Sequence, residues 1–175
     1  YPILQFGKIP LASQTNDAMW VDIQTGETRI RLIGCHLQTT NFSKKRRLLD
    51  DPVLQNADIQ QVEDVVTDIS QELAQNFKIR ATQAQIVRQV IDTTRIPTIV
   101  CGDFNDTPSS YTYQYIKGDL KDSFKTRGSG YAYTFRGIHH LLRIDFILYS
   151  KEFKCTDYYS PKKEWSDHNP VISEF

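Results

Sequence analysis

The sequence predicts a mixed α/β domain built in layers, with strands and helices alternating along its 175 residues. Two short segments near the start alternate apolar and polar residues, as half-buried strands do. A longer central segment repeats apolar residues every three or four positions, which is helical spacing. Short apolar runs separated by turn residues follow. The order of strand pair, helices, strand, helix and further strands favours an α/β or α+β architecture in one domain.

A β-hairpin is expected between residues 18 and 35. The segments AMWVDI and TRIRLIGC are joined by QTGE, which supplies a glycine for the turn. Ile30 and Leu32 alternate with arginines in the second segment, as in a strand with one buried face. This strand leads directly into His36.

Residues 57–93 are predicted to form two helices, because apolar residues recur there at helical spacing. They include Ile59, Val62, Val66, Ile69, Leu73, Ile79, Ile86 and Val90. We expect the break between the two helices at AQNFK, residues 74–78. A further helix is expected after TPSS, with Pro108 near its first turn and Ser109 or Ser110 as its N-cap.

Four more strands are predicted in the second half of the chain. RIPTIVC (95–101) is short, β-branched and continuously apolar, as expected of a strand covered on both faces. The others are YAYTF (131–135), RIDFILYS (143–150) and VISEF (171–175). The alternating aromatic residues of YAYTF are expected to lie mainly in the core.

Charge and cysteine usage argue against several classes of protein. Lys+Arg and Asp+Glu both number 21, so strong nonspecific binding to nucleic acid is not expected. Cys35, Cys101 and Cys155 lie far apart, so we predict reduced, structural thiols rather than a zinc cluster or a disulfide framework. No apolar run approaches the ~20 residues of a membrane helix. These residues therefore favour a water-soluble domain, and its compartment stays open.

Polar residues end or interrupt four of the predicted strands. They are His36 in IGCHLQ, Asp103 and Asn105 in IVCGDFND, Asp145 in RIDFIL, and Asp167 and His168 in EWSDHNP. Each alone fits an ordinary role, since GDFND could be a turn and SDHNP a capped loop. Asp145 is harder to explain this way. A buried carboxylate costs several kcal/mol unless it is paired, with Arg143, a histidine or a metal as candidates. Together these residues favour one site at one edge of the sheets.

The motifs HLQ, GDFND, RIDFIL and SDHNP, in this order, resemble those of the endonuclease/exonuclease/phosphatase superfamily. The resemblance covers the whole chain. It implies the deoxyribonuclease-I-like fold, with two mostly antiparallel sheets packed together and flanked by helices. It also implies hydrolysis of phosphoesters with Mg²⁺ or Mn²⁺. A binding module that keeps this fold without catalysis is the alternative.

The resemblance also implies roles for single residues. Asp103 orients or deprotonates the attacking water, and Asn105 holds a phosphate oxygen and helps to place that carboxylate. His168 contacts the scissile phosphate with Asp145 as its partner. Chemistry supports this pair, since an imidazolium held charged by an acid can stabilise a phosphoryl transition state.

Metal and substrate contacts complete the predicted site. Asp167 and Asp103 are the expected metal acids, because Mg²⁺ prefers carboxylate oxygens. His36 is expected to contact the phosphate from the opposite side, and Arg143 is a further candidate for substrate binding, together with Asn105.

The resemblance predicts that residues 1–175 are the C-terminal portion of a larger domain. The superfamily's first half supplies an Asn and a Glu, the main metal ligand, and neither has a match here. We therefore expect weak Mg²⁺ binding and weak or absent activity from these residues alone. The chain also resembles a bacterial subgroup with recurring GDFNDTP, GDLKDSF and RIDFIL motifs. A hydrophobic anchor often precedes the domain in that subgroup, which would make the full-length protein membrane-associated.

The substrate stays open among small phosphodiesters, lipid headgroups and nucleic acid. The basic segment NFSKKRRLLDD (41–51) either begins a solvated helix balanced by its own aspartates or forms a lip facing phosphate. His139 and His140 are adjacent, so they are expected to point apart as surface or substrate-contacting residues rather than to share a metal.

Overall fold

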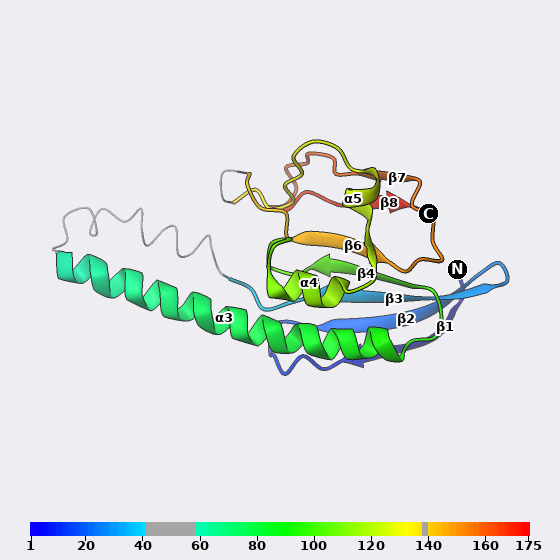
Figure 1. The fold of residues 1–175 in the computed structure, drawn as a ribbon, viewed down its shortest axis with the longest axis horizontal. Helices are drawn as coiled ribbons and strands as arrows, with labels where there is room; N and C mark the ends of the chain where they lie inside the picture. The colour runs from blue at the N-terminus through cyan, green and yellow to red at the C-terminus, as the bar shows by residue number, and fades with distance from the viewer. Residues whose placement is uncertain (41–58, 138–139) are drawn as a thin grey trace.

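A six-stranded sheet forms the centre of the computed structural model, which describes residues 1–40, 59–137 and 140–175. Its strand order is β1-β2-β3-β4-β6-β5 (Figure 1). The strands are β1 (Ile3–Ile9), β2 (Ala18–Thr25), β3 (Thr28–His36), β4 (Thr98–Asp103), β5 (Lys121–Asp122) and β6 (Asp145–Tyr149). All neighbouring strands are antiparallel except β3 and β4. Parallel pairing brings the ends of β3 and β4 to the same edge of the sheet.

A second, two-stranded antiparallel sheet contains β7 (Asp157–Tyr159) and β8 (Ile172–Glu174). It packs beside β6, where the ring of Phe175 lies edge-on to the ring of Tyr149, with centroids 5.0 Å apart. The short helix α5 (Ser123–Arg127) contacts β7 through Phe124 and Tyr158. The predicted layered α/β fold with mostly antiparallel sheets is confirmed.

The main core lies between the large sheet and two helices, α3 (Ile59–Thr93) and α4 (Tyr111–Lys117). Ala84 and Val87 of α3 and Ile116 of α4 are fully buried against Ile33 and Val100 of the sheet. Figure 1 shows α3 running along the sheet and extending well beyond the strand ends. Burial of this apolar surface is the main stabilising contribution.

The predicted break at residues 74–78 is wrong, since α3 is a single helix of 35 residues. The stretch AQNFK contains neither glycine nor proline, so nothing in it opposes helical geometry. Asn76, within this stretch, is buried, and its Oδ1 accepts a hydrogen bond from Gln38 Nε2. A tertiary contact therefore satisfies this polar side chain inside the helix.

The predicted strand at residues 131–135 is also wrong. Only Phe135 pairs there, in isolated bridges with Leu142 and His168. The backbone amides of Thr134 and Phe135 both donate to the carbonyl of Leu142, so the regular ladder cannot continue. Of the three alternating aromatic residues, Phe135 is buried and Tyr131 is 69% exposed.

Other expectations hold where the structure describes them. The hairpin joins β2 to β3, and Ser110 caps α4 by accepting from the amide of Tyr113. All three cysteines are free. Within the described residues, no helix has the length and apolarity needed to cross a membrane. The basic segment 41–51 and His139 lie outside the described residues.

Candidate active site

The predicted site begins where three strands end side by side. In the sheet register, His36 at the end of β3 lies beside Asp103 at the end of β4. Asp103 in turn lies opposite Asp145, the first residue of β6. Three polar residues from distant parts of the sequence therefore occupy one row at the edge of the sheet.

Gly102 allows the backbone of β4 to take this position. Its φ is +140°, which side chains disfavour, and a Cβ atom there would lie 1.9 Å from the carbonyl oxygen of Cys35 on β3. Only glycine permits such a close approach. The glycine of GDFND thus fixes the backbone immediately before Asp103.

Asn105 holds the carboxylate of Asp103 in place. Its backbone amide donates to Asp103 Oδ1 at 2.7 Å, and its Nδ2 donates to Asp103 Oδ2 at 3.0 Å. The same Nδ2 donates to the carbonyl of Leu37, just beyond β3. Asn105 has a φ of +51°, a left-handed conformation that asparagine tolerates better than most residues. It therefore ties Asp103 to the end of β3.

Asp103 is kept in an environment that disfavours its charge. Burial, and secondarily the nearby Asp145, raise its pKa from 3.8 to about 6, although the amide of Asn105 and the two histidines act in the opposite direction. A carboxylate in such an environment is suited to bind a cation or to take a proton from water. The carboxylate is paired only partly, because both histidine nitrogens lie about 4 Å away.

His168 and Asp145 form a hydrogen-bonded pair. His168 Nδ1 lies 2.9 Å from Asp145 Oδ2. An ionised carboxylate can only accept, so Nδ1 carries the proton and Nε2 is directed elsewhere. The bond to Asp145 raises the pKa of His168, opposed in part by burial. The imidazole is therefore biased toward its charged form.

A buried threonine and an aromatic ring support this pair. Thr134 Oγ1 accepts from the backbone amides of Ile144 and Asp145, which fixes the start of β6. The ring of Phe135 lies 5.1 Å from the ring of His168. Residues 131–135, which do not form the predicted strand, therefore help to position Asp145 and His168.

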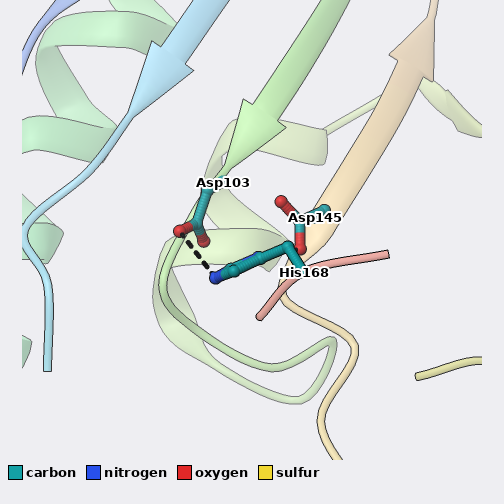
Figure 2. A group of neighbouring side chains, drawn as sticks. All are labelled: Asp103, Asp145 and His168. Atoms are coloured by element: carbon teal, nitrogen blue, oxygen red, sulfur yellow. Dashed lines mark hydrogen bonds and ion pairs between the residues drawn. The ribbon is translucent and has the colours of Figure 1, made fainter. Parts of the chain in front are cut away.

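Figure 2 shows His168 between the carboxylates of Asp103 and Asp145. His168 Nε2 is 4.0 Å from Asp103 Oδ2, and His36 Nε2 is 3.9 Å from the same oxygen. These separations exceed a hydrogen bond, so two imidazoles flank one carboxylate without direct contact. Among the described residues, Asp103, Asp145 and His168 form a group whose ligand atoms lie within 4.8 Å of one another and could hold a metal ion.

Two predicted site residues lie apart from this group. The guanidinium of Arg143, which was expected to bind substrate, is buried and donates to Asp122 at 2.9 Å. It is also not the partner of Asp145, a role that His168 fills. Asp167 is exposed, and its Oδ1 accepts from the hydroxyl of Ser166. The carboxylate of Asp167 is not a member of the Asp103–Asp145–His168 group.

The structure adds residues that sequence reasoning missed. Arg80 of α3 is fully buried and donates to Asp106, the last residue of GDFND, at 3.1 Å. It also donates to the carbonyl of Gln38 and the hydroxyl of Thr40, in the segment after β3. An arginine at a core position of a helix was the available signal, because a buried charge requires a partner.

The comparisons with known proteins agree with this geometry. The model of the endonuclease/exonuclease/phosphatase family matches residues 2–168. The chain therefore belongs to the endonuclease/exonuclease/phosphatase family. No curated protein matches the sequence.

Solved structures share the fold at low identity. A functionally unknown conserved protein from Enterococcus faecalis is 17% identical, with a TM-score of 0.68, and the match covers 99% of this chain and 66% of that one. A mannosyl-6-phosphatase from Bacteroides thetaiotaomicron is 20% identical, with a TM-score of 0.63 and coverage of 99% and 66%. The human Nocturnin catalytic domain with bound sulfate is 18% identical, with a TM-score of 0.64 and coverage of 98% and 58%. The chain thus spans about two thirds or less of the length of these structures.

Proposed function

We propose that the protein containing these residues hydrolyses phosphoesters with the help of a divalent metal ion. One observation carries the proposal. Asp103, Asp145 and His168 come from three separate segments and meet within a few ångströms at one edge of the sheet. Membership of the endonuclease/exonuclease/phosphatase family supports the same class of reaction.

The donor set fits a divalent cation. Two carboxylates and an imidazole converge, and burial disfavours the charge of Asp103. A cation beside Asp103 would relieve both that desolvation and the repulsion from Asp145. We propose Mg²⁺ or Mn²⁺, with Asp103 as its carboxylate ligand in this group, because hard cations prefer carboxylate oxygens. Asp167, which lies outside the group, is not needed for this role. When bound, the ion would polarise the phosphoryl group and lower the pKa of a bound water.

The side chains supply the remaining steps. Asp103, fixed by Asn105, orients the attacking water and accepts its proton. His168 presents Nε2–H to a phosphoryl oxygen, while Asp145 accepts from Nδ1–H and favours the charged form of the ring. His36 can contact a phosphoryl oxygen from the other side of Asp103. The phosphoryl group would lie beside Asp103 within reach of both imidazoles, so that the developing charge meets donors that are already placed.

Replacing His168 with alanine in the full-length protein tests the proposal. Hydrolysis of bis(p-nitrophenyl) phosphate, measured with Mg²⁺ or Mn²⁺ and again with EDTA, should fall by about 10²- to 10⁴-fold in the variant. His140→Ala is the matched control, because this histidine stacks on Tyr133 rather than on the Asp103 group. Equal activity in wild-type and His168→Ala proteins would contradict the proposal.

A binding module that keeps the fold is the other candidate function. It predicts phosphate binding without turnover in the wild-type protein under any metal. The arrangement of Asp103 and His168 favours the enzyme, since a module that only binds needs no desolvated carboxylate held near a charged imidazole.

A further inference from the structure

An exposed tryptophan stands at the edge of the groove that contains His168. Trp165 is 86% exposed, an unusual state for so large an apolar side chain. It lines a cavity of about 560 Å³ together with Lys163, Asp145 and His168. This volume lies within the range that accommodates a small organic ligand.

The loop that carries Trp165 is held in a fixed conformation. The Nη1 atom of Arg136 donates to the carbonyls of Lys163 and Ser166, on either side of the tryptophan. The backbone amide of Arg136 donates to the carbonyl of Asp167 at 2.8 Å. The indole is therefore exposed on a braced loop, and a ligand that stacks on it would order little additional chain.

A positively charged side chain, Lys163, lies near the indole ring of Trp165. The ammonium of Lys163 lies 5.3 Å from the centroid of Trp165, within the range of a cation–π contact. The exposure of the indole shows that Lys163 covers only a small part of it. An aromatic face beside a positive charge favours a ligand that is both planar and anionic.

We propose that Trp165 and Lys163 form a stacking platform for the organic part of the substrate, and that this part carries a planar aromatic ring such as a nucleobase. The proposal rests on the proposed phosphoester hydrolysis, because His168 would hold the phosphate while the ring lies on Trp165. Trp165 is a specificity residue of that same groove. A ligand without a ring keeps the phosphate contacts and loses the platform.

Binding without turnover tests this platform. Adenosine 5′-monophosphate and ribose 5-phosphate share the sugar phosphate and differ in the ring, so we would titrate both and follow tryptophan fluorescence and calorimetric heat. Only the adenosine compound should quench Trp165. Trp165→Leu should weaken its binding by about 5- to 150-fold, the range for one base stacked on one aromatic ring. Trp165→Phe should retain most of the affinity.

The remaining outcomes distinguish a failure of the stacking platform from a failure of the proposed hydrolysis. Ribose 5-phosphate should bind wild-type and Trp165→Leu proteins equally, because it never reaches the ring. Equal affinity for the two ligands, or no effect of Trp165→Leu on the adenosine compound, would overturn the platform even if hydrolysis is observed. Ring-dependent quenching in a full-length protein without hydrolytic activity would uphold the platform and reject the proposed reaction.

Discussion

Asp103 shows how one residue connects stability with chemistry. Its carboxylate is partly desolvated and lies near a second carboxylate, and its pKa is raised to about 6. A proton therefore binds this group more tightly in the folded protein than in the unfolded chain, where the ordinary value of 3.8 applies. Its contribution to stability is fully present below pH 3.8 and is lost as the pH rises through about 6.

Asp103→Asn should consequently stabilise the metal-free protein above pH 6. The expected gain in unfolding free energy is on the order of 1–3 kcal/mol, reduced by the weaker hydrogen bond to Asn105. Thermal melts at pH 7.5 and pH 4 check this, with ~2–4 °C expected per kcal/mol for a chain of this size. The gain should vanish at pH 4.

The same variant should lose its response to metal. Mg²⁺ or Mn²⁺ should raise the melting temperature of the wild-type protein, because a ligand that binds only the folded state stabilises it. Asp103→Asn should show no such rise. Asp68→Asn, an exposed carboxylate on α3, should match wild type in both measurements. Equal metal stabilisation of both Asp variants would contradict the assigned role of Asp103.

At the scale of elements, α3 connects the helical layer with the loops of the site. Its buried face is apolar at Ala84 and Val87, where it crosses the sheet. Nearer its N-terminus the same face is polar, with Arg80 bound to Asp106 and Gln83 Oε1 accepting from the amide of Gln38. The helix therefore braces the segments that follow β3 and β4.

Removing Arg80 should destabilise the protein strongly. Arg80→Ala leaves Asp106 buried without its partner, which costs about 3–5 kcal/mol. Lys8→Ala breaks an ion pair with Asp17 in which both side chains are exposed, for which about 0–1 kcal/mol is expected. Urea denaturation of the two variants measures the difference. Similar losses would show that the Arg80–Asp106 pair has no special role.

For the whole molecule, local signals in the sequence were sufficient for β2, β3, β4 and β6 of the large sheet and for the polar residues at their ends, whereas β1 and β5 were not predicted. His36, Asp103 and Asp145 each end or begin a strand whose apolar pattern is clear, so their convergence could be predicted. The need of a buried carboxylate for a partner left Arg143, a histidine or a metal as candidates for Asp145, and the resemblance to the superfamily pointed to His168. The positions of these strand ends follow from residues that are close together in the sequence and from the pairing of neighbouring strands.

Long-range contacts explain what could not be predicted. A helix break was expected at residues 74–78, and the contact there between Asn76 and Gln38 cannot be seen in a linear sequence. Arg143 was a candidate for substrate binding because nothing local indicates its buried pairing with Asp122. Arg80 was missed although its core position on a helix marked it as a buried charge, because its partner Asp106 is far away in the sequence. Each of these side chains is satisfied by a residue from another element.

A double-mutant cycle on Asp145 and His168 tests the central claim, that separate strand ends form one hydrolytic site. Initial rates of metal-dependent phosphodiester hydrolysis would be compared for wild type, Asp145→Asn, His168→Ala and the double variant. Residues that act as a unit lose activity non-additively. We predict at least a ~10²-fold loss for His168→Ala and no further loss in the double variant. Multiplicative losses, or a His168→Ala protein as active as wild type, would contradict the account.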